Sequence, residues 1–174
     1  MTAVVNREKI RRNFVSAAHA ATTCVLYSAK IGSTENLVAR VSLLYFIWDT
    51  VYIMAQEKME YGYLYHHALA IHSLLRNDIP SEIVLYILFV SEFSNLPGYY
   101  VYHQLKLGKD PAVMRVVQFL WFSYFRMYKY IEIIVMYYIV NREIIAFQFW
   151  AIFAFSLAVW HKQLKKISEY FYLL

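Results

Sequence analysis

The chain has 174 residues, of which 60% are hydrophobic and 19% aromatic, and its mean hydropathy is +0.38. Soluble domains usually keep about half of their residues polar, so this composition indicates an integral membrane protein. The net charge of +5 does not indicate a nucleic-acid partner, because the basic residues lie in short flanks between apolar segments.

Six apolar segments follow one another along the chain, with lengths suited to membrane-crossing helices. They cover residues 13–31, 37–56, 61–75, 80–97, 112–140 and 143–162. Pro80 and Pro111 are expected to open two of these helices, and Pro97 with Gly98 is expected to close one. Because only "RNDIP" separates the third segment from the fourth, a re-entrant hairpin over 61–97 is the alternative to two full crossings.

The basic residues flanking these segments are unequally distributed. With six crossings both termini lie on one side, which receives Arg7, Lys9, Arg11, Arg12, Lys58, Lys106, Lys109, Arg115, Lys162, Lys165 and Lys166. The other side receives Lys30, Arg40, Arg76 and Arg142. This bias predicts that both termini are cytoplasmic. We therefore predict an all-α, polytopic membrane protein, with six transmembrane helices in one domain over 1–174 and a core at about 11–165.

Four of the predicted helices each place one titratable side chain at a similar depth. Counting inward from the cytoplasmic ends at about 1.5 Å per residue, His19, Asp49, His67 and Glu92 lie about 7 to 11 Å deep. Ionisable groups inside a bilayer are costly, so they usually face the bundle interior. An imidazole can accept a proton or act as a nucleophile while a carboxylate orients it. We therefore expect one polar layer, which is either a functional site or a purely structural network.

The histidine pair in "YLYHHALAIHSLL" (63–75) belongs to this layer. Adjacent residues on a helix point about 100° apart, so His66 and His67 are not expected to occupy one point. One is expected to face the interior while the other caps or packs. Asp49, within "YFIWDTVYI", needs a buried partner, and an ion pair with a histidine is the structural alternative to a functional role.

The fifth segment carries three charged residues in "WFSYFRMYKYIEII". Lys129 and Glu132 are three residues apart, which predicts a structural pair on the helix. Arg126 lies roughly 20 Å from the cytoplasmic edge, too far for easy snorkelling, so we expect it to face the interior. A phospholipid headgroup or a substrate carboxylate is the functional alternative to structural pairing of Arg126.

Five stretches of the chain, in order and spacing, resemble a TLC domain, the family of TRAM, Lag and CLN-type multispanning membrane proteins. They are "SAAHA" (16–20), "YFIWD" (45–49), "YHHALAIHSLL" (65–75), "SEFSNLPGYY" (91–100) and "FSYFR" (122–126). The resemblance covers about residues 11–165. It implies a six-helix bundle or barrel that handles lipids in the endoplasmic reticulum or a related endomembrane.

In the ceramide synthase branch, such a bundle transfers an acyl chain from acyl-CoA to a sphingoid base, and the paired histidines form the core of the site. If this chain is an enzyme, the resemblance implies the catalytic residues His66, His67 and Asp49. The lipid-binding residues that we expect are His19, Asp49, His67, Glu92, Ser94 and Arg126.

Ceramide synthases continue after the histidine pair with a His-Asp-x-x-Asp element, where this chain has Ser91, Glu92 and Asn95. The stretch is closer to the Glu-x-Ser pattern of the TLCD and TMEM-type branch. We therefore expect a protein that binds, senses or regulates membrane lipids through an intramembrane cavity with a polar floor. An acyl-CoA-dependent acyltransferase is one alternative, and a structural or scaffolding membrane component is another.

The remaining expectations concern cofactors and partners. The single cysteine, Cys24, excludes an intramolecular disulfide, and no spacing of Cys and His predicts a metal site. We expect no cofactor, with acyl-CoA as the candidate substrate of the enzyme alternative. Membrane lipids or acyl chains are the expected partners, without nucleic acid, and both homo- and hetero-oligomers stay open.

Overall fold

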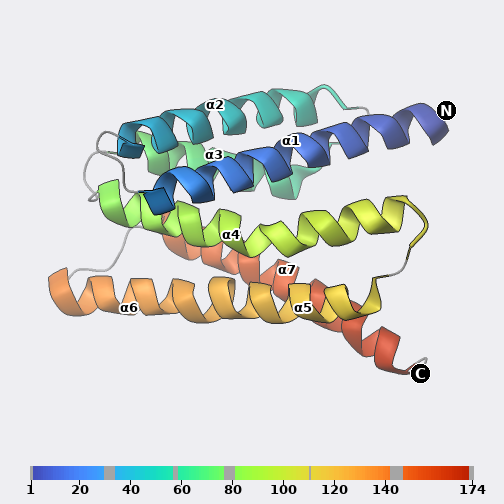
Figure 1. Ribbon diagram of the computed structural model, residues 1–174. Coiled ribbons are helices and arrows are strands. Elements are labelled where there is room, and N and C mark those ends of the chain that lie inside the picture. Colours follow the sequence, from blue (N-terminus) through green and yellow to red (C-terminus); the bar gives the residue numbers. More distant parts are fainter. Residues whose placement is uncertain are drawn as a thin grey trace.

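The computed structural model describes residues 2–29, 34–56, 59–76, 81–109, 111–141 and 147–172, and these residues are almost entirely helical. The helices are α1 (Thr2–Ala29), α2 (Thr34–Met54), α3 (Tyr61–Leu75), α4 (Ser81–Lys106), α5 (Ala112–Phe122), η1 (Ser123–Lys129), α6 (Tyr130–Asn141) and α7 (Phe147–Tyr172). Since α5, η1 and α6 follow one another without a break, they form one rod (Figure 1). The all-α prediction is confirmed for the described residues.

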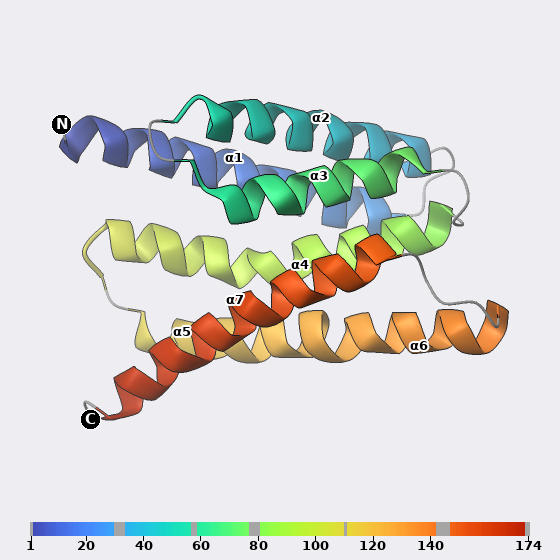
Figure 2. The same ribbon diagram turned by 180° about the vertical axis from the view of Figure 1, so that it is seen from behind.

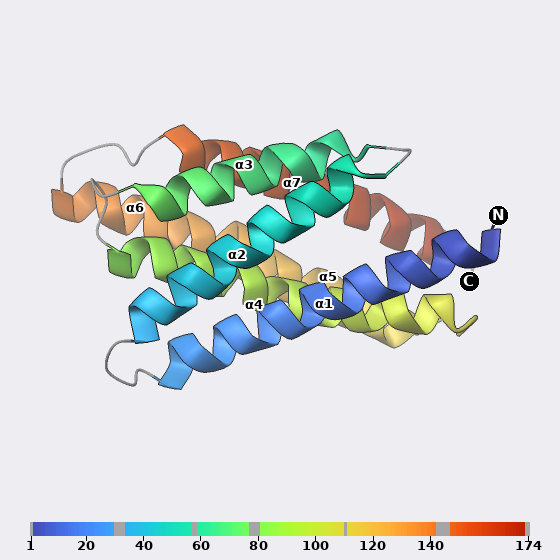
Figure 3. The same ribbon diagram turned by 90° about the horizontal axis from the view of Figure 1, so that it is seen from above.

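The helices pack as an elongated bundle in which α4 is central. It contacts α1 and α2 on one side and the rod of α5, η1 and α6 on the other. Helix α7 crosses this rod obliquely and reaches α3 (Figure 2). Seen from above, α1 and α2 diverge at a shallow angle, and α2 lies between α1 and α3 (Figure 3). The N- and C-terminal ends of the chain lie at the same end of the bundle, which we call the terminal end (Figure 1).

The expected helix 80–97 continues further than the sequence predicts. Pro97 lies inside α4, which runs to Lys106, so the prediction that Pro97 and Gly98 close the helix was wrong. Proline cannot donate to the carbonyl four residues earlier, but the Phe93 carbonyl accepts a 2.9 Å hydrogen bond from the Trp121 indole N–H instead. The helix therefore passes the proline without leaving the Phe93 carbonyl unpaired.

Gly98 has a packing role rather than a terminating one. A Cβ at this position would lie 3.1 Å from Gln118 Nε2, so the glycine permits the close approach of α4 and α5. After α4 the chain turns at Gly108, whose φ of 72° is a conformation that favours glycine. Pro111 directly precedes α5, as predicted. Pro80 and most of the "RNDIP" linker lie outside the described residues.

Several charged side chains are buried, while many large apolar side chains are exposed. Asp49, Glu92 and Arg126 are 1%, 3% and 4% exposed, whereas Val140 and Phe14 are 72% exposed. One helical stretch among the described residues, Asn36–Met54, is by itself long and apolar enough to cross a membrane. The described helices thus bury a group of polar side chains next to two apolar core clusters, and they expose many large apolar side chains.

Candidate functional site

A cavity of about 370 Å³ lies inside the bundle, lined by residues of α1, α2, α3, α4, α7 and the rod. The exposed Lys9 and Lys106 lie at one end of this cavity, and the buried Glu92 and Arg126 lie at the other. Lys106 is the last residue of α4, which ends at the terminal end of the bundle (Figure 1). The cavity therefore opens toward the terminal end.

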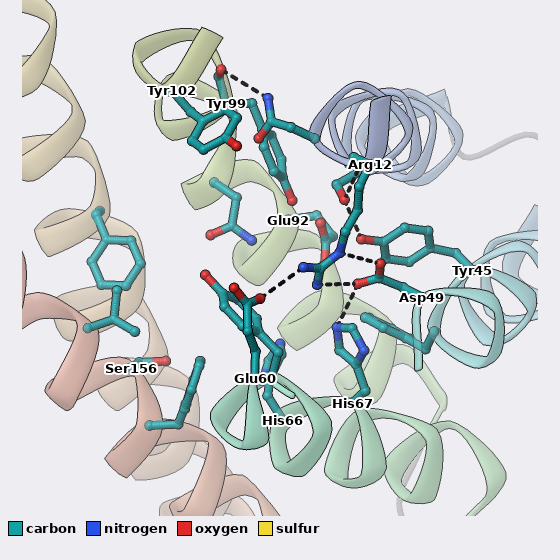
Figure 4. A pocket seen from close by; sticks show the side chains of 18 of the residues that line it. Arg12, Tyr45, Asp49, Glu60, His66, His67, Glu92, Tyr99, Tyr102 and Ser156 are labelled. Carbon is teal, nitrogen blue, oxygen red and sulfur yellow. Dashed lines mark hydrogen bonds and ion pairs between the residues drawn. The ribbon is translucent and has the colours of Figure 1, made fainter. Parts of the chain in front are cut away.

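Arg12 on α1 holds two carboxylates at the wall of this cavity. It donates to Asp49 Oδ1 from Nε at 2.7 Å and to Asp49 Oδ2 from Nη2 at 3.0 Å. Its Nη1 donates to Glu60 Oε2 at 3.0 Å. Figure 4 shows this guanidinium between the two carboxylates. The two carboxylates of Asp49 and Glu60 balance the positive charge of this partly buried guanidinium.

Sequence reasoning used Arg12 only as a flanking charge and missed it as a site residue. Its spacing was the available signal, because Arg12, Ser16, His19 and Thr23 are four, three and four residues apart. They therefore share one face of α1. Ser16 accepts a 2.8 Å hydrogen bond from Tyr45 Oη, so this face also fixes a tyrosine of α2 at the cavity.

The two histidines of α3 both line the cavity but contact different helices. His67 Nε2 lies 3.5 Å from Asp49 Oδ2, and its Nδ1 lies 3.5 Å from the Thr50 hydroxyl. His66 stacks on Phe155 of α7, with ring centroids 4.9 Å apart. The expected divergence of the pair is confirmed. Asp49 does contact a histidine, but its ion-pair partner is Arg12 and not a histidine as expected.

His19 and Glu92 form a second pair behind the cavity wall. His19 Nδ1 lies 3.7 Å from Glu92 Oε2, while its Nε2 contacts the Ser42 hydroxyl at 3.1 Å. Tyr45 stacks on the His19 ring at 3.9 Å and separates it from the cavity. Thus Glu92 lines the cavity, whereas His19 is absent from its lining. The structure brings all four titratable residues of the predicted layer together, in two pairs.

Arg126 reaches the same layer from the rod. It lies in η1, a seven-residue π-helix of the kind often found at functional sites. Its guanidinium donates to Ser94 Oγ at 2.8 Å, to Ser156 Oγ at 3.2 Å and to the Ser91 carbonyl at 3.1 Å. Ser94 therefore positions Arg126 and is not part of the cavity lining, and its assignment as a lipid-binding residue stays a prediction.

The predicted depth of Glu92 was wrong, because it was counted from Pro97 as the end of the helix. The expected depth of Arg126, roughly 20 Å, agrees with its position in the rod. Since α4 runs to Lys106, Glu92 lies 14 residues, or about 21 Å, from the end of its helix. Arg126 lies 14 residues from the start of α5 at Ala112, so the two residues are level.

Lys129 and Glu132 lie outside the site. Lys129 Nζ contacts Glu132 Oε2 at 2.6 Å on the outer surface of the rod, so the predicted structural pair is confirmed. Among the described residues, no group of three or more His, Cys, Asp or Glu side chains is placed to hold a metal ion.

The arrangement offers two kinds of chemistry. The His67 imidazole beside a carboxylate is suited to proton transfer or nucleophilic attack. The buried guanidinium of Arg126 is suited to an anionic or strongly polar headgroup. Comparisons with protein-family models, curated proteins and solved structures found no match.

Proposed function

We propose that this chain is a multi-pass membrane protein that binds membrane lipid in the polar cavity of its helix bundle. The observation that carries the proposal is the cavity itself, where Asp49, His67, Glu92 and Arg126 line a hollow inside a bundle with an apolar exterior. Ligand pockets commonly combine apolar walls with a few convergent polar groups. In a bilayer, such intramembrane polar residues by default mark a functional site.

The exterior supports placing the bundle in a bilayer. Apart from Glu132 and Asn141, helix α6 consists of apolar and aromatic residues on all sides, yet Ile131, Val135 and Ile139 are 43% to 51% exposed. A helix that is hydrophobic all round is normally buried in protein or in lipid. Because protein covers little of α6 among the described residues, lipid is its natural surrounding. The described residues form six helical segments, namely α1, α2, α3, α4, the rod of α5, η1 and α6, and α7. Their number, with both termini at one end, supports six crossings and cytoplasmic termini as part of the proposal.

The same proposal places the chain in the TLC-domain family, closer to the TLCD and TMEM-type branch, and in the endoplasmic reticulum or a related endomembrane. Each of the five resembling stretches contributes to the polar layer, through His19, Asp49, the histidine pair, Glu92 and Arg126. In this role the protein senses or regulates membrane lipid composition.

Co-purifying lipid tests the proposal. The full chain is purified in mild detergent and its bound lipids are measured by native mass spectrometry. His67→Ala should lower lipid occupancy, because it removes a polar group from the cavity. His72→Ala, on the same helix but exposed, is the matched control and should leave occupancy unchanged. Wild-type protein without bound lipid, or equal losses in both variants, would leave the structural or scaffolding role as the better account.

Acyl transfer is the second candidate, and the contact between His67 and Asp49 favours it. The imidazole lies in the cavity and beside a carboxylate that can orient it and stabilise its cation. In this reaction, a histidine nitrogen attacks the acyl-CoA thioester carbon, the carbon–sulfur bond breaks, and coenzyme A leaves as the free thiol. The acyl group then passes to an amine or hydroxyl acceptor.

Purified protein incubated with oleoyl-CoA should then release free thiol or carry an acyl adduct on His66 or His67. The adduct is located by peptide mass spectrometry, and His72→Ala again serves as the control. If neither free thiol nor an acyl adduct is detected in the presence of long-chain amine, lysolipid or glycerol acceptors, this candidate is excluded.

A further inference from the structure

A second hollow, larger in volume than the polar cavity, lies between α3, α4, α5 and α7. It is a groove of about 610 Å³. Its apolar wall includes Val101 and Leu105 of α4, Val116 of α5, and Val159 and Ile167 of α7. This wall is long enough along α4 and α7 to hold part of an extended hydrocarbon chain.

Two glycines shape this groove. Gly62 and Gly98 both line it, and neither fills it with a side chain. A Cβ at Gly62 would lie 3.5 Å from Phe155 Cε2, which is ordinary van der Waals contact, so this position has room for a Cβ. Gly62 is therefore a position from which the groove can be filled.

The charges along the groove are mainly positive. Lys162 and Lys166 of α7 are exposed and four residues apart, so they lie one above the other on one face of the helix. Arg115 of α5 also lines the groove. Among the residues that the structure describes, the one acidic residue in the lining is Glu60, whose carboxylate already accepts a hydrogen bond from Arg12 at 3.0 Å. The groove thus offers an apolar wall beside a cationic rim.

The groove and the polar cavity share a wall. Tyr63, Tyr102, Phe155 and Val159 line both hollows. Two of these aromatic residues, Tyr63 and Phe155, pack against each other, with ring centroids 6.3 Å apart. A ligand in the groove therefore lies directly beside the polar cavity, on a side that faces out between α4, α5 and α7.

We propose that this groove is a second lipid site, for an anionic phospholipid. The acyl chain lies along the apolar wall, and the phosphate is held by Lys162 and Lys166. Charge complementarity selects this occupant, because the rim carries an excess of cations and Lys side chains near a membrane surface attract anionic headgroups. The inference rests on the proposed function in placing the bundle in a bilayer, but it concerns residues outside the polar cavity.

Lipid titration of the full chain in detergent micelles tests this site by native mass spectrometry. The probes are dioleoyl phosphatidic acid and the zwitterionic dioleoyl phosphatidylcholine. Lys162→Gln and Lys166→Gln should each weaken phosphatidic acid binding about fivefold. Lys165→Gln is the matched control, because Lys165 lies between them on α7, is absent from the groove lining, and pairs with Glu169 at 4.0 Å.

A variant that fills the groove gives an independent readout. Gly62→Leu should weaken binding of phosphatidic acid in the groove without affecting lipid that depends on His67. Equal effects of the three lysine variants, equal binding of both probes, or full phosphatidic acid binding by Gly62→Leu would each overturn the groove site. Retention of His67-dependent lipid in that case would leave the proposed function standing, whereas a wild-type chain that binds no lipid would overturn both.

Discussion

Arg12 on α1 and Asp49 on α2 are joined by two parallel hydrogen bonds, of 2.7 and 3.0 Å. The Asp49 side chain is 2% exposed and the Arg12 side chain 19% exposed, so the carboxylate depends on this guanidinium for its charge balance. The same guanidinium reaches Glu60 just before α3. One residue near the start of the chain therefore connects three segments at the wall of the polar cavity.

Replacing Arg12 by Gln should lower the free energy of unfolding by about 3 kcal/mol, because it leaves the buried Asp49 carboxylate without its partner. The double variant Arg12→Gln with Asp49→Asn should lose less than the sum of the two single changes, because the unpaired charge is gone. Unfolding in detergent, followed by the loss of helical circular dichroism, measures these differences.

The surface pair of Lys129 and Glu132 is the control for this prediction. Glu132→Gln removes a contact of 2.6 Å that lies on the exposed side of the rod. Pairs of this kind add little to stability, so no measurable change is expected. Additive effects of the Arg12 and Asp49 changes would show that the two residues do not act as a pair.

Much of the fold could be predicted because the two ends of an apolar run can be recognised in the sequence. The expected segment 61–75 coincides with α3, and 112–140 differs by one residue from the rod that ends at Asn141. The end of α4 could not be predicted in the same way. The donor that satisfies the Phe93 carbonyl is Trp121, 28 residues further along the chain, and no local pattern around Pro97 reveals it.

Some residues of the candidate site could be predicted from the sequence, and others could not. Asp49, His67 and Glu92 stand out in the sequence because each interrupts an apolar run. Arg12 does not, because a basic residue beside an apolar segment equally indicates membrane orientation. Ser156 could not be predicted for another reason. A single uncharged hydroxyl in an apolar helix gives no indication in the sequence that it accepts a hydrogen bond from Arg126.

The bond from Trp121 to the Phe93 carbonyl predicts a coupling with Pro97. Trp121→Phe should cost about 1 to 3 kcal/mol, because it leaves a carbonyl unsatisfied while keeping an aromatic ring against Phe93. In a Pro97→Ala background, the restored backbone N–H can donate to that carbonyl. The cost of Trp121→Phe should then fall below half of its original value, as measured by the same unfolding assay. An unchanged cost would show that the indole hydrogen bond is not what lets α4 continue through Pro97.

Arg126 is expected to require a guanidinium and not only a positive charge. Arg126→Lys keeps the charge but cannot donate to acceptors on α4 and α7 together, so stability should fall by about 2 kcal/mol. Ser156→Ala removes one acceptor and should cost about 1 kcal/mol. Thermal unfolding and bound-lipid content are measured on both variants. Wild-type stability and lipid content in Arg126→Lys would argue that the three hydrogen bonds do not matter.

The crossing of the membrane can be tested at the two ends of the bundle. In a Cys24→Ser background, single cysteines are placed at Lys109, after α4 at the terminal end, and at Asn36, near the start of α2 at the opposite end. Both positions are exposed. In sealed microsomes with the cytoplasmic face outward, an impermeant maleimide should label Lys109→Cys at once but Asn36→Cys only after detergent is added. Equal labelling of both before detergent would mean that α2 does not separate the two faces of the membrane, and the multi-pass arrangement would have to be abandoned.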